Sequence, residues 1–163
     1  MKLHSLFLTL LLIAPAGAQP WLKAKLLVVP GKSLGPIVLG KPIPKEAYQL
    51  MGPGAGSANV TKNTSKDGAA VEWMAPKDVY IRVKCHDGNQ PENAFQIFWT
   101  APNPRTAGGL GVGSSATAVV KAFPKGRWTN QSMDGYPTWE TPGLNWTFDE
   151  KRTKVLEMHL RKP

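Results

Sequence analysis

Few residues in the chain could act as a nucleophile or as a general base. Cys85 is the only cysteine, and the strand-like alternation around it places Cys85 and His86 on opposite faces, so these neighbours cannot form a thiol–imidazole pair. A pairing of Cys85 with the distant His159 stays open. Ser114 and Ser115 lack the Gly-x-Ser-x-Gly spacing of a nucleophile elbow. These residues argue against catalysis, and a small hydrolase that uses a loop serine or Cys85 is kept as an alternative.

Patterns for cofactors and metals are also weak. The run from Gly109 to Gly113 resembles a phosphate-cradling loop, but no Lys-Ser/Thr pair follows it and no long apolar strand precedes it. No cluster of His, Cys, Asp and Glu has the spacing of a zinc or calcium site. We therefore predict no metal, no cofactor and no enzymatic activity.

The first 18 residues have the pattern of a signal peptide. A short basic start is followed by the apolar stretch from Leu6 to Ala14 and by the small residues Ala16-Gly17-Ala18. The apolar stretch is shorter than the roughly 20 residues that a membrane-spanning helix needs. We expect cleavage before Gln19 and export to the periplasm or the extracellular space. An uncleaved N-terminal anchor is the alternative.

The charge of the chain suggests an anionic partner. The formal net charge is +9, and removal of residues 1–18, whose only charged residue is Lys2, leaves +8. Such a surface suits an acidic protein, an anionic envelope polymer or anionic lipid headgroups. The lysines are scattered along the sequence, and export also argues against a nucleic-acid partner. General solubility is the competing explanation for the charge.

A short pattern that occurs twice suggests how the chain is organised. Leu39-Gly40 and Val112-Gly113 are 73 residues apart, and each opens a helix-like run that is followed by strands. The first helix should extend to Leu50 or Met51. The second should run from Ala116 to about Phe123, with Ser114 or Ser115 as its N-cap. We expect an arm or first strand at 19–36, a first unit at 37–105 and a second unit at 106–163.

Alternating hydrophobicity predicts the strands of both units and their inward faces. The clearest case is Val79–Cys85, and similar runs occur at 95–99, 144–148 and 155–160. The predicted fold is α+β: two tandem helix-then-antiparallel-sheet units whose sheets join into one curved surface, with the helices on the other face. The inward set comprises Val79, Ile81, Val83, Cys85, Phe95, Ile97, Trp99, Leu156, Met158 and Leu160.

The order of these elements resembles a known family. Leu-Gly, a helix and then paired strands that end in Gly143-Leu144-Asn145-Trp146-Thr147-Phe148-Asp149 are similar to the tandem unit of the beta-lactamase-inhibitor-protein-like fold, and the resemblance spans residues 37–163. The small lipoprotein of the outer-membrane assembly machinery carries a single related unit. The resemblance implies a concave sheet surface and a protein that binds other proteins. The inhibitor's disulfide pattern and the lipidated cysteine are missing, so no specific target is implied.

Alternation also predicts which side chains remain on the solvent face. Aromatic and guanidinium groups on a rigid sheet suit protein recognition, because rings bury a large area and arginine pairs well with carboxylates. The hypothesis is a non-catalytic binding protein that uses this face on an acidic protein. An anionic polymer or lipid is the alternative partner, and an ordinary hydrated sheet face is the alternative without function. The predicted binding residues are Tyr80, Arg82, Lys84, Phe98, His159 and Arg161.

Overall fold

The computed structural model describes residues 20–49, 70–75, 79–85, 93–130 and 135–163. The predicted signal peptide at 1–18 lies outside the described residues. Within them, no helix has the length and apolar character that crossing a membrane requires.

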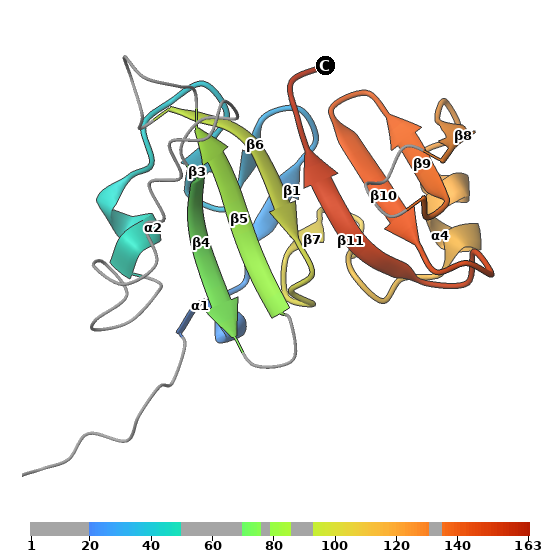
Figure 1. Ribbon diagram of the computed structural model, residues 1–163, viewed down its shortest axis with the longest axis horizontal. Coiled ribbons are helices and arrows are strands. Elements are labelled where there is room, and N and C mark those ends of the chain that lie inside the picture. The colour runs from blue at the N-terminus through green and yellow to red at the C-terminus, as the bar shows by residue number, and fades with distance from the viewer. Residues whose placement is uncertain (1–19, 50–69, 76–78, 86–92, 131–134) are drawn as a thin grey trace, which may run out of the picture.

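A seven-stranded sheet forms the larger layer of the molecule (Figure 1). Every neighbouring pair of strands in it is antiparallel. Its centre is the pairing of β6 with β11, which joins segments far apart in the sequence. In spatial order the strands are β4 (Ala70–Ala75), β5 (Val79–Cys85), β6 (Ala94–Trp99), β11 (Val155–Leu160), β10 (Leu144–Phe148), β9 (Thr138–Thr141) and β8 (Arg127–Thr129).

A second, four-stranded sheet lies behind β4, β5 and β6 in Figure 1. Its strands are only two or three residues long, in the order β3 (Ile37–Val38), β2 (Ser33–Leu34), β1 (Leu27–Val29) and β7 (Arg105–Thr106). β1 pairs with β2 in antiparallel and with β7 in parallel orientation. The helices of the described residues are also short, with four to seven residues: α1 (Pro20–Lys23), α2 (Lys45–Gln49) and α4 (Ala116–Ala122).

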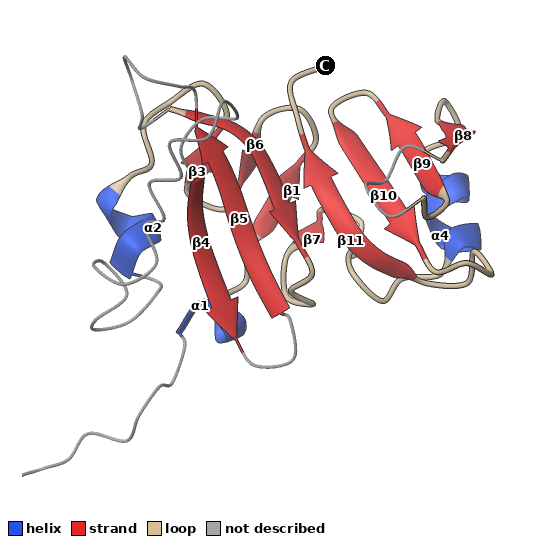
Figure 2. Cartoon of the chain, in the orientation of Figure 1, coloured by secondary structure: helices blue, strands red, loops and turns tan. Residues whose placement is uncertain are grey.

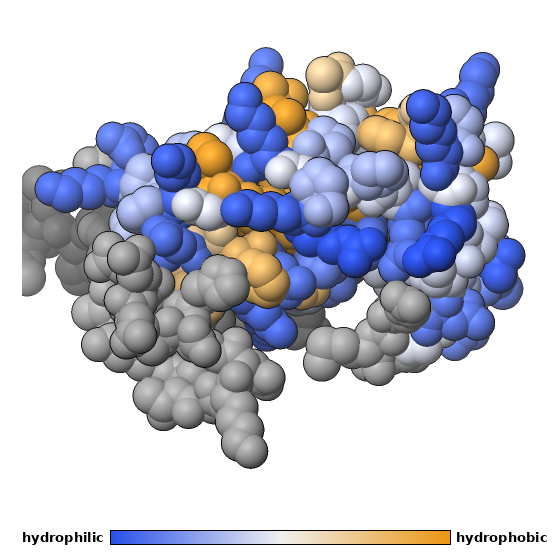
Figure 3. Space-filling view, turned by 90° about the horizontal axis from the view of Figure 1, so that it is seen from above, coloured by the Kyte–Doolittle hydropathy of each residue, from blue (hydrophilic) through white to orange (hydrophobic). Residues whose placement is uncertain are grey.

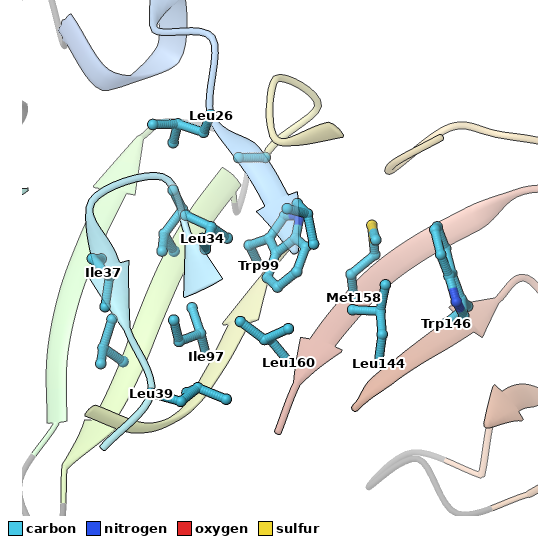
Figure 4. Close-up of a cluster of buried hydrophobic side chains, with 14 of the residues drawn as sticks. Leu26, Leu34, Ile37, Leu39, Ile97, Trp99, Leu144, Trp146, Met158 and Leu160 are labelled. Atoms are coloured by element: carbon cyan, nitrogen blue, oxygen red, sulfur yellow. The ribbon is translucent and has the colours of Figure 1, made fainter. Parts of the chain in front are cut away.

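The hydrophobic core lies between the large sheet and the layer behind it. Figure 4 shows side chains of the small sheet, such as Leu34, beside Ile97 and Trp99 of β6. One row of inward residues crosses six neighbouring strands in register, and we call it the inner row. The inner row consists of Trp128, Trp139, Trp146, Met158, Trp99 and Ile81.

Two glycines allow the two sheets to touch. The backbone N–H of Gly31, in the turn between β1 and β2, donates to the carbonyl of Gly143, in the turn between β9 and β10, at 3.0 Å. A Cβ atom on Gly143 would lie 2.4 Å from the Cα of Gly31, and Gly143 also has a positive φ of 77°. Any other residue at position 143 would therefore push the turns apart.

The predicted fold class is wrong. The chain is mostly strand and has two sheets, not two helix-then-sheet units, as Figure 2 shows by its few blue segments. Residues 19–36 were predicted to be an arm or a first strand, and the structure has β1 and β2 there and β3 directly after them. Strands of two or three residues have too few positions to show a period, so tertiary pairing alone creates them. The helix at 116–122 was predicted correctly, and of its two candidate caps, Ser114 and Ser115, the structure uses Ser115, whose Oγ accepts from the Ala118 N–H.

Two of the residues predicted to face the core are exposed. Phe95 is 39% and Leu156 is 41% exposed. A register shift in the β5–β6 pair places Ala94, and not Phe95, beside Cys85. A similar shift in the β10–β11 pair places Val155, and not Leu156, beside Phe148. Such β-bulges insert one extra residue, so the simple alternation rule fails on one side of each shift.

Candidate binding face

The six predicted binding residues lie on three neighbouring strands. In the sheet, Arg82 pairs with Phe98, and Phe98 pairs with His159. Tyr80 and Lys84 are two residues away from Arg82 on β5, so they point to the same side of the sheet. Arg161 follows β11 directly. The structure thus brings Tyr80, Arg82, Lys84, Phe98, His159 and Arg161 together on the side opposite the core, and we call this surface the outer face.

Aromatic rings and cations are layered on the outer face. The rings of Phe98 and His159 stack at a centroid distance of 4.0 Å and an angle of 14°. The Lys84 Nζ lies 5.5 Å from the centre of the Phe98 ring. The Arg82 guanidinium lies 5.3 Å from the centre of the Tyr80 ring. Each cation–π contact of this kind contributes about 0.5–1 kcal/mol at a partly exposed site and restrains the charged group.

Two acidic residues near the outer face, Glu157 and Glu140, are engaged within the protein. The Tyr80 hydroxyl donates to the Glu157 carboxylate. Glu140 is only 6% exposed and accepts from Arg127 through Nε and Nη2, both at 3.1 Å. Arg161 Nη2 lies 3.8 Å from the same carboxylate, and the Arg161 side chain is 41% exposed. Since 3.8 Å is a weak contact, the charge of Arg161 stays available to solvent or to a partner.

His159 is the most unusual group on this surface. Burial first, and then the positive charges of Arg161 and Lys84, lower its pKa from 6.5 to about 4. The imidazole is therefore neutral at pH 7. Its Nε2 is buried, and within the part of the chain that the structure describes it has no hydrogen-bond partner.

The same face continues onto β9 and β10 with a different character. Glu140 and Asn145 follow His159 in register, and Thr138 and Thr147 form the next row. All four side chains are less than 9% exposed. Sequence reasoning missed this part, although alternation along 144–148 places Asn145 and Thr147 outward. The missing information was the strand order, which alone shows that Asn145 lies beside His159.

The structure separates the candidate nucleophile Cys85 from His159. Cys85 is 2% exposed and faces the core, whereas His159 lies on the outer face, so the two sit on opposite sides of the sheet. The Ser114 Oγ accepts from the Gly111 N–H at 3.0 Å and from Arg105 Nη1 at 3.3 Å, which holds the glycine-rich loop. Among the described residues, no group of three or more His, Cys, Asp or Glu side chains could hold a metal ion.

A shallow cavity of about 350 Å³ lies at the other end of the sheet, and none of the six outer-face residues lines it. Its lining consists of Asn130, Gly135, Tyr136, Pro137 and Glu150. Seen from above in Figure 3, hydrophilic residues cover most of the described surface and hydrophobic residues show between them.

Comparison with known proteins found no match to a family model, to a curated protein or to a solved structure. The resemblance to the beta-lactamase-inhibitor-protein-like family therefore stays a prediction.

Proposed function

We propose that the protein is an exported, non-catalytic binding protein that docks an acidic protein partner on the outer face. The observation that carries the proposal is the set of contacts between cations and aromatic rings on three neighbouring strands. The carboxylates of Glu157 and Glu140 next to these groups already have partners within the protein. The pattern of residues 1–18 supports export.

The outer face has the physical properties of a recognition surface. Its aromatic rings are held by the sheet, so binding costs little side-chain entropy. Lys84 and Arg82, which both carry a positive charge, are restrained by their ring contacts. A partner that carries carboxylates would complement this charge, and electrostatic attraction would raise its rate of association.

Charge reversal on the face tests the proposal. We expect Arg82→Glu with Lys84→Glu to weaken binding of poly-L-glutamate, used as an acidic probe, at least tenfold at low salt, about 1.4 kcal/mol. The matched control is Lys121→Glu with Lys125→Glu, which changes the net charge equally at exposed positions in and just after α4, behind the sheet. Titration calorimetry measures both affinities.

The two variants distinguish binding at the outer face from binding by net charge alone. A weak complex for the β5 variant and an unchanged complex for the α4 variant would support the outer face. Equal losses in both variants would mean that net charge alone binds the probe, which would contradict the assignment. The β5 variant should also lose partners captured by the wild-type protein from envelope extract.

An envelope-associated protein that binds an anionic polymer or lipid is the second candidate. It is favoured by exposed cations at the turn between β10 and β11, where Lys151, Arg152 and Lys154 are all exposed. Binding to vesicles that contain anionic phospholipid should then fall steeply as salt rises. Binding that persists undiminished in high salt would count against this candidate.

A further inference from the structure

A β-bulge exposes one aromatic side chain beside the outer face. Phe95 is 39% exposed, although alternation predicts it in the core. On one side of the register shift, Ala94 pairs with Cys85. On the other side Gln96 pairs with Lys84, and Phe95 is the extra residue between them. Bulges of this kind redirect side chains at functional sites. Phe95 therefore extends the outer face, next to the position opposite Lys84, with an exposed ring.

Lysines from distant parts of the chain lie beside the start of β6. The Gly40 N–H donates to the Ala94 carbonyl at 2.6 Å, and the Ala94 N–H donates to the Lys41 carbonyl at 2.9 Å. A Cβ atom on Gly40 would lie 2.8 Å from the Lys162 Nζ. Both Lys41 and Lys162 are exposed. The fold thus brings two exposed lysines, far apart in the sequence, to the residue that precedes Phe95.

The segments that meet at this end carry positive charge only. Residues 37–41, 94–99 and 159–163 contain no Asp or Glu. By contrast, the turn at 149–154 contains two acidic residues among its cations. The end of the sheet beside Phe95 is therefore the better complement for an anionic partner. Its cations are Lys41, Arg161 and Lys162.

We propose that Phe95, Lys41 and Lys162 form an anchor site for a segment of the acidic partner protein that carries one apolar side chain among its carboxylates. This inference rests on the proposed function and names the class of segment that the partner presents. The apolar side chain packs on the exposed ring, and the carboxylates lie near the two ammonium groups. Interfaces commonly combine a buried aromatic residue with polar groups at its rim.

The distribution of exposed apolar side chains favours a protein segment over a membrane. The exposed large hydrophobic residues of the described structure are Leu27, Phe95 and Leu156. Leu27 belongs to the small sheet. Leu156 lies at the start of β11, at the end of the large sheet opposite Phe95, because β6 and β11 are antiparallel. One isolated ring offers little area for insertion into a bilayer, whereas a peptide segment can cover it.

The test uses two synthetic glutamate peptides of equal length and charge, one with a central leucine and one with a central glycine. We expect the wild-type protein to bind the leucine peptide about tenfold more tightly, because the leucine and the Phe95 ring leave water together. Phe95→Gln should lose this preference and keep its affinity for the glycine peptide, whereas Phe95→Leu should retain the preference. The matched control is Leu156→Gln, which removes the exposed apolar residue at the other bulge and should leave the preference intact.

Charge reversal tests the two lysines of the anchor site. Lys41→Glu with Lys162→Glu should weaken binding of both peptides about fivefold and leave the preference for leucine, since the ring is unchanged. The matched control is Lys151→Glu with Lys154→Glu, at the opposite end of the sheet. An equal loss in the control would mean that net charge, and not the anchor site, attracts the carboxylates. Titration calorimetry at low salt measures all affinities, and thermal melting identifies variants that lose the fold.

The outcomes separate the anchor site from the outer face. Equal binding of both peptides by the wild-type protein, or an equal loss of preference in Leu156→Gln and Phe95→Gln, would overturn the anchor site. If Arg82→Glu with Lys84→Glu still weakens binding of poly-L-glutamate in that case, the proposed function stands. If those reversals have no effect, the proposed function itself fails. A loss of binding to anionic phospholipid vesicles in Phe95→Gln, as large as its loss for the leucine peptide, would overturn the choice of a protein segment.

Discussion

The two sides of the large sheet use the same strands in the same register and have opposite chemistry. The inner row is made of tryptophans, a methionine and an isoleucine that are packed into the core, apart from the half-buried Trp128. The matching row on the other side crosses the same six strands, and we call it the outer row. The outer row consists of Arg127, Glu140, Asn145, His159, Phe98 and Arg82.

The comparison teaches how stability and binding can be divided between two faces of one sheet. Inner-row side chains contribute by leaving water, and the area they bury stabilises the fold. Outer-row side chains form ion pairs and ring contacts that contribute less to folding. Substitutions in the inner row should therefore lower stability, whereas substitutions at the exposed end of the outer row should lower binding.

Truncation in the inner row should have the largest effect. Trp146 is fully buried, and we expect Trp146→Ala to lower the free energy of unfolding by about 3–5 kcal/mol, since a large cavity remains. Urea titration measures the change. The control is Trp146→Phe, which removes an indole N–H that has no partner within the described structure and should cost much less. A loss of unfolding free energy below about 1 kcal/mol for the alanine variant would contradict the view that the inner row provides the stability of the fold.

Acidification should reveal the cost of holding His159 neutral in the outer row. The unfolded imidazole takes up a proton near pH 6.5, whereas the folded one does so only at a pKa of about 4. Between these values the unfolded chain binds more protons, so stability falls as pH decreases from 6.5 to 4. The expected contribution is about 3 kcal/mol. Denaturant titrations at several pH values should show a shallower decline for His159→Gln. Parallel curves for wild type and variant would contradict the prediction.

Loss of the buried carboxylate in the outer row should have the smallest effect. Glu140→Gln removes a charge that Arg127 contacts at 3.1 Å, but Arg127 is 76% exposed and solvent screens the pair. We expect a loss of about 1–2 kcal/mol in chemical denaturation. Glu150→Gln, at an exposed turn position, is the control and should change stability by less than about 0.5 kcal/mol. Equal effects at positions 140 and 150 would mean that the ion pair adds nothing to the sheet.

Parts of the fold could be predicted because they are encoded locally. The strands at 79–85, 144–148 and 155–160 alternate over five to seven residues and occur as expected. The helix at 116–122 begins at a serine cap that the sequence also indicates. Each of these signals depends only on residues a few positions apart. The small sheet could not be predicted in this way, because its strands are two or three residues long and β1 pairs with the distant β7.

The candidate binding face could also be predicted only in part from the sequence. Alternation along each strand was enough to assign Tyr80, Arg82 and Lys84 to the side away from the core. It could not show that His159 stacks on Phe98, because that contact depends on β11 lying beside β6. Nor could it show that Asn145 and Glu140 extend the same row. Bulges misled the assignment of Phe95 and Leu156 for the same reason, since a bulge is a property of a pair of strands.

The sequence by itself therefore determined the direction of side chains along the longer strands outside the bulges, the apolar or polar character of each face and the excess of positive charge. The tertiary structure alone decided the strand order, the second sheet, the helices' small share of the fold and the contacts that bring His159, Lys84 and Arg161 together. The physical reason is that side-chain direction follows from local backbone geometry. Strand partners are selected by the packing of the whole core, where the burial of Trp99 and Trp146 outweighs any local preference.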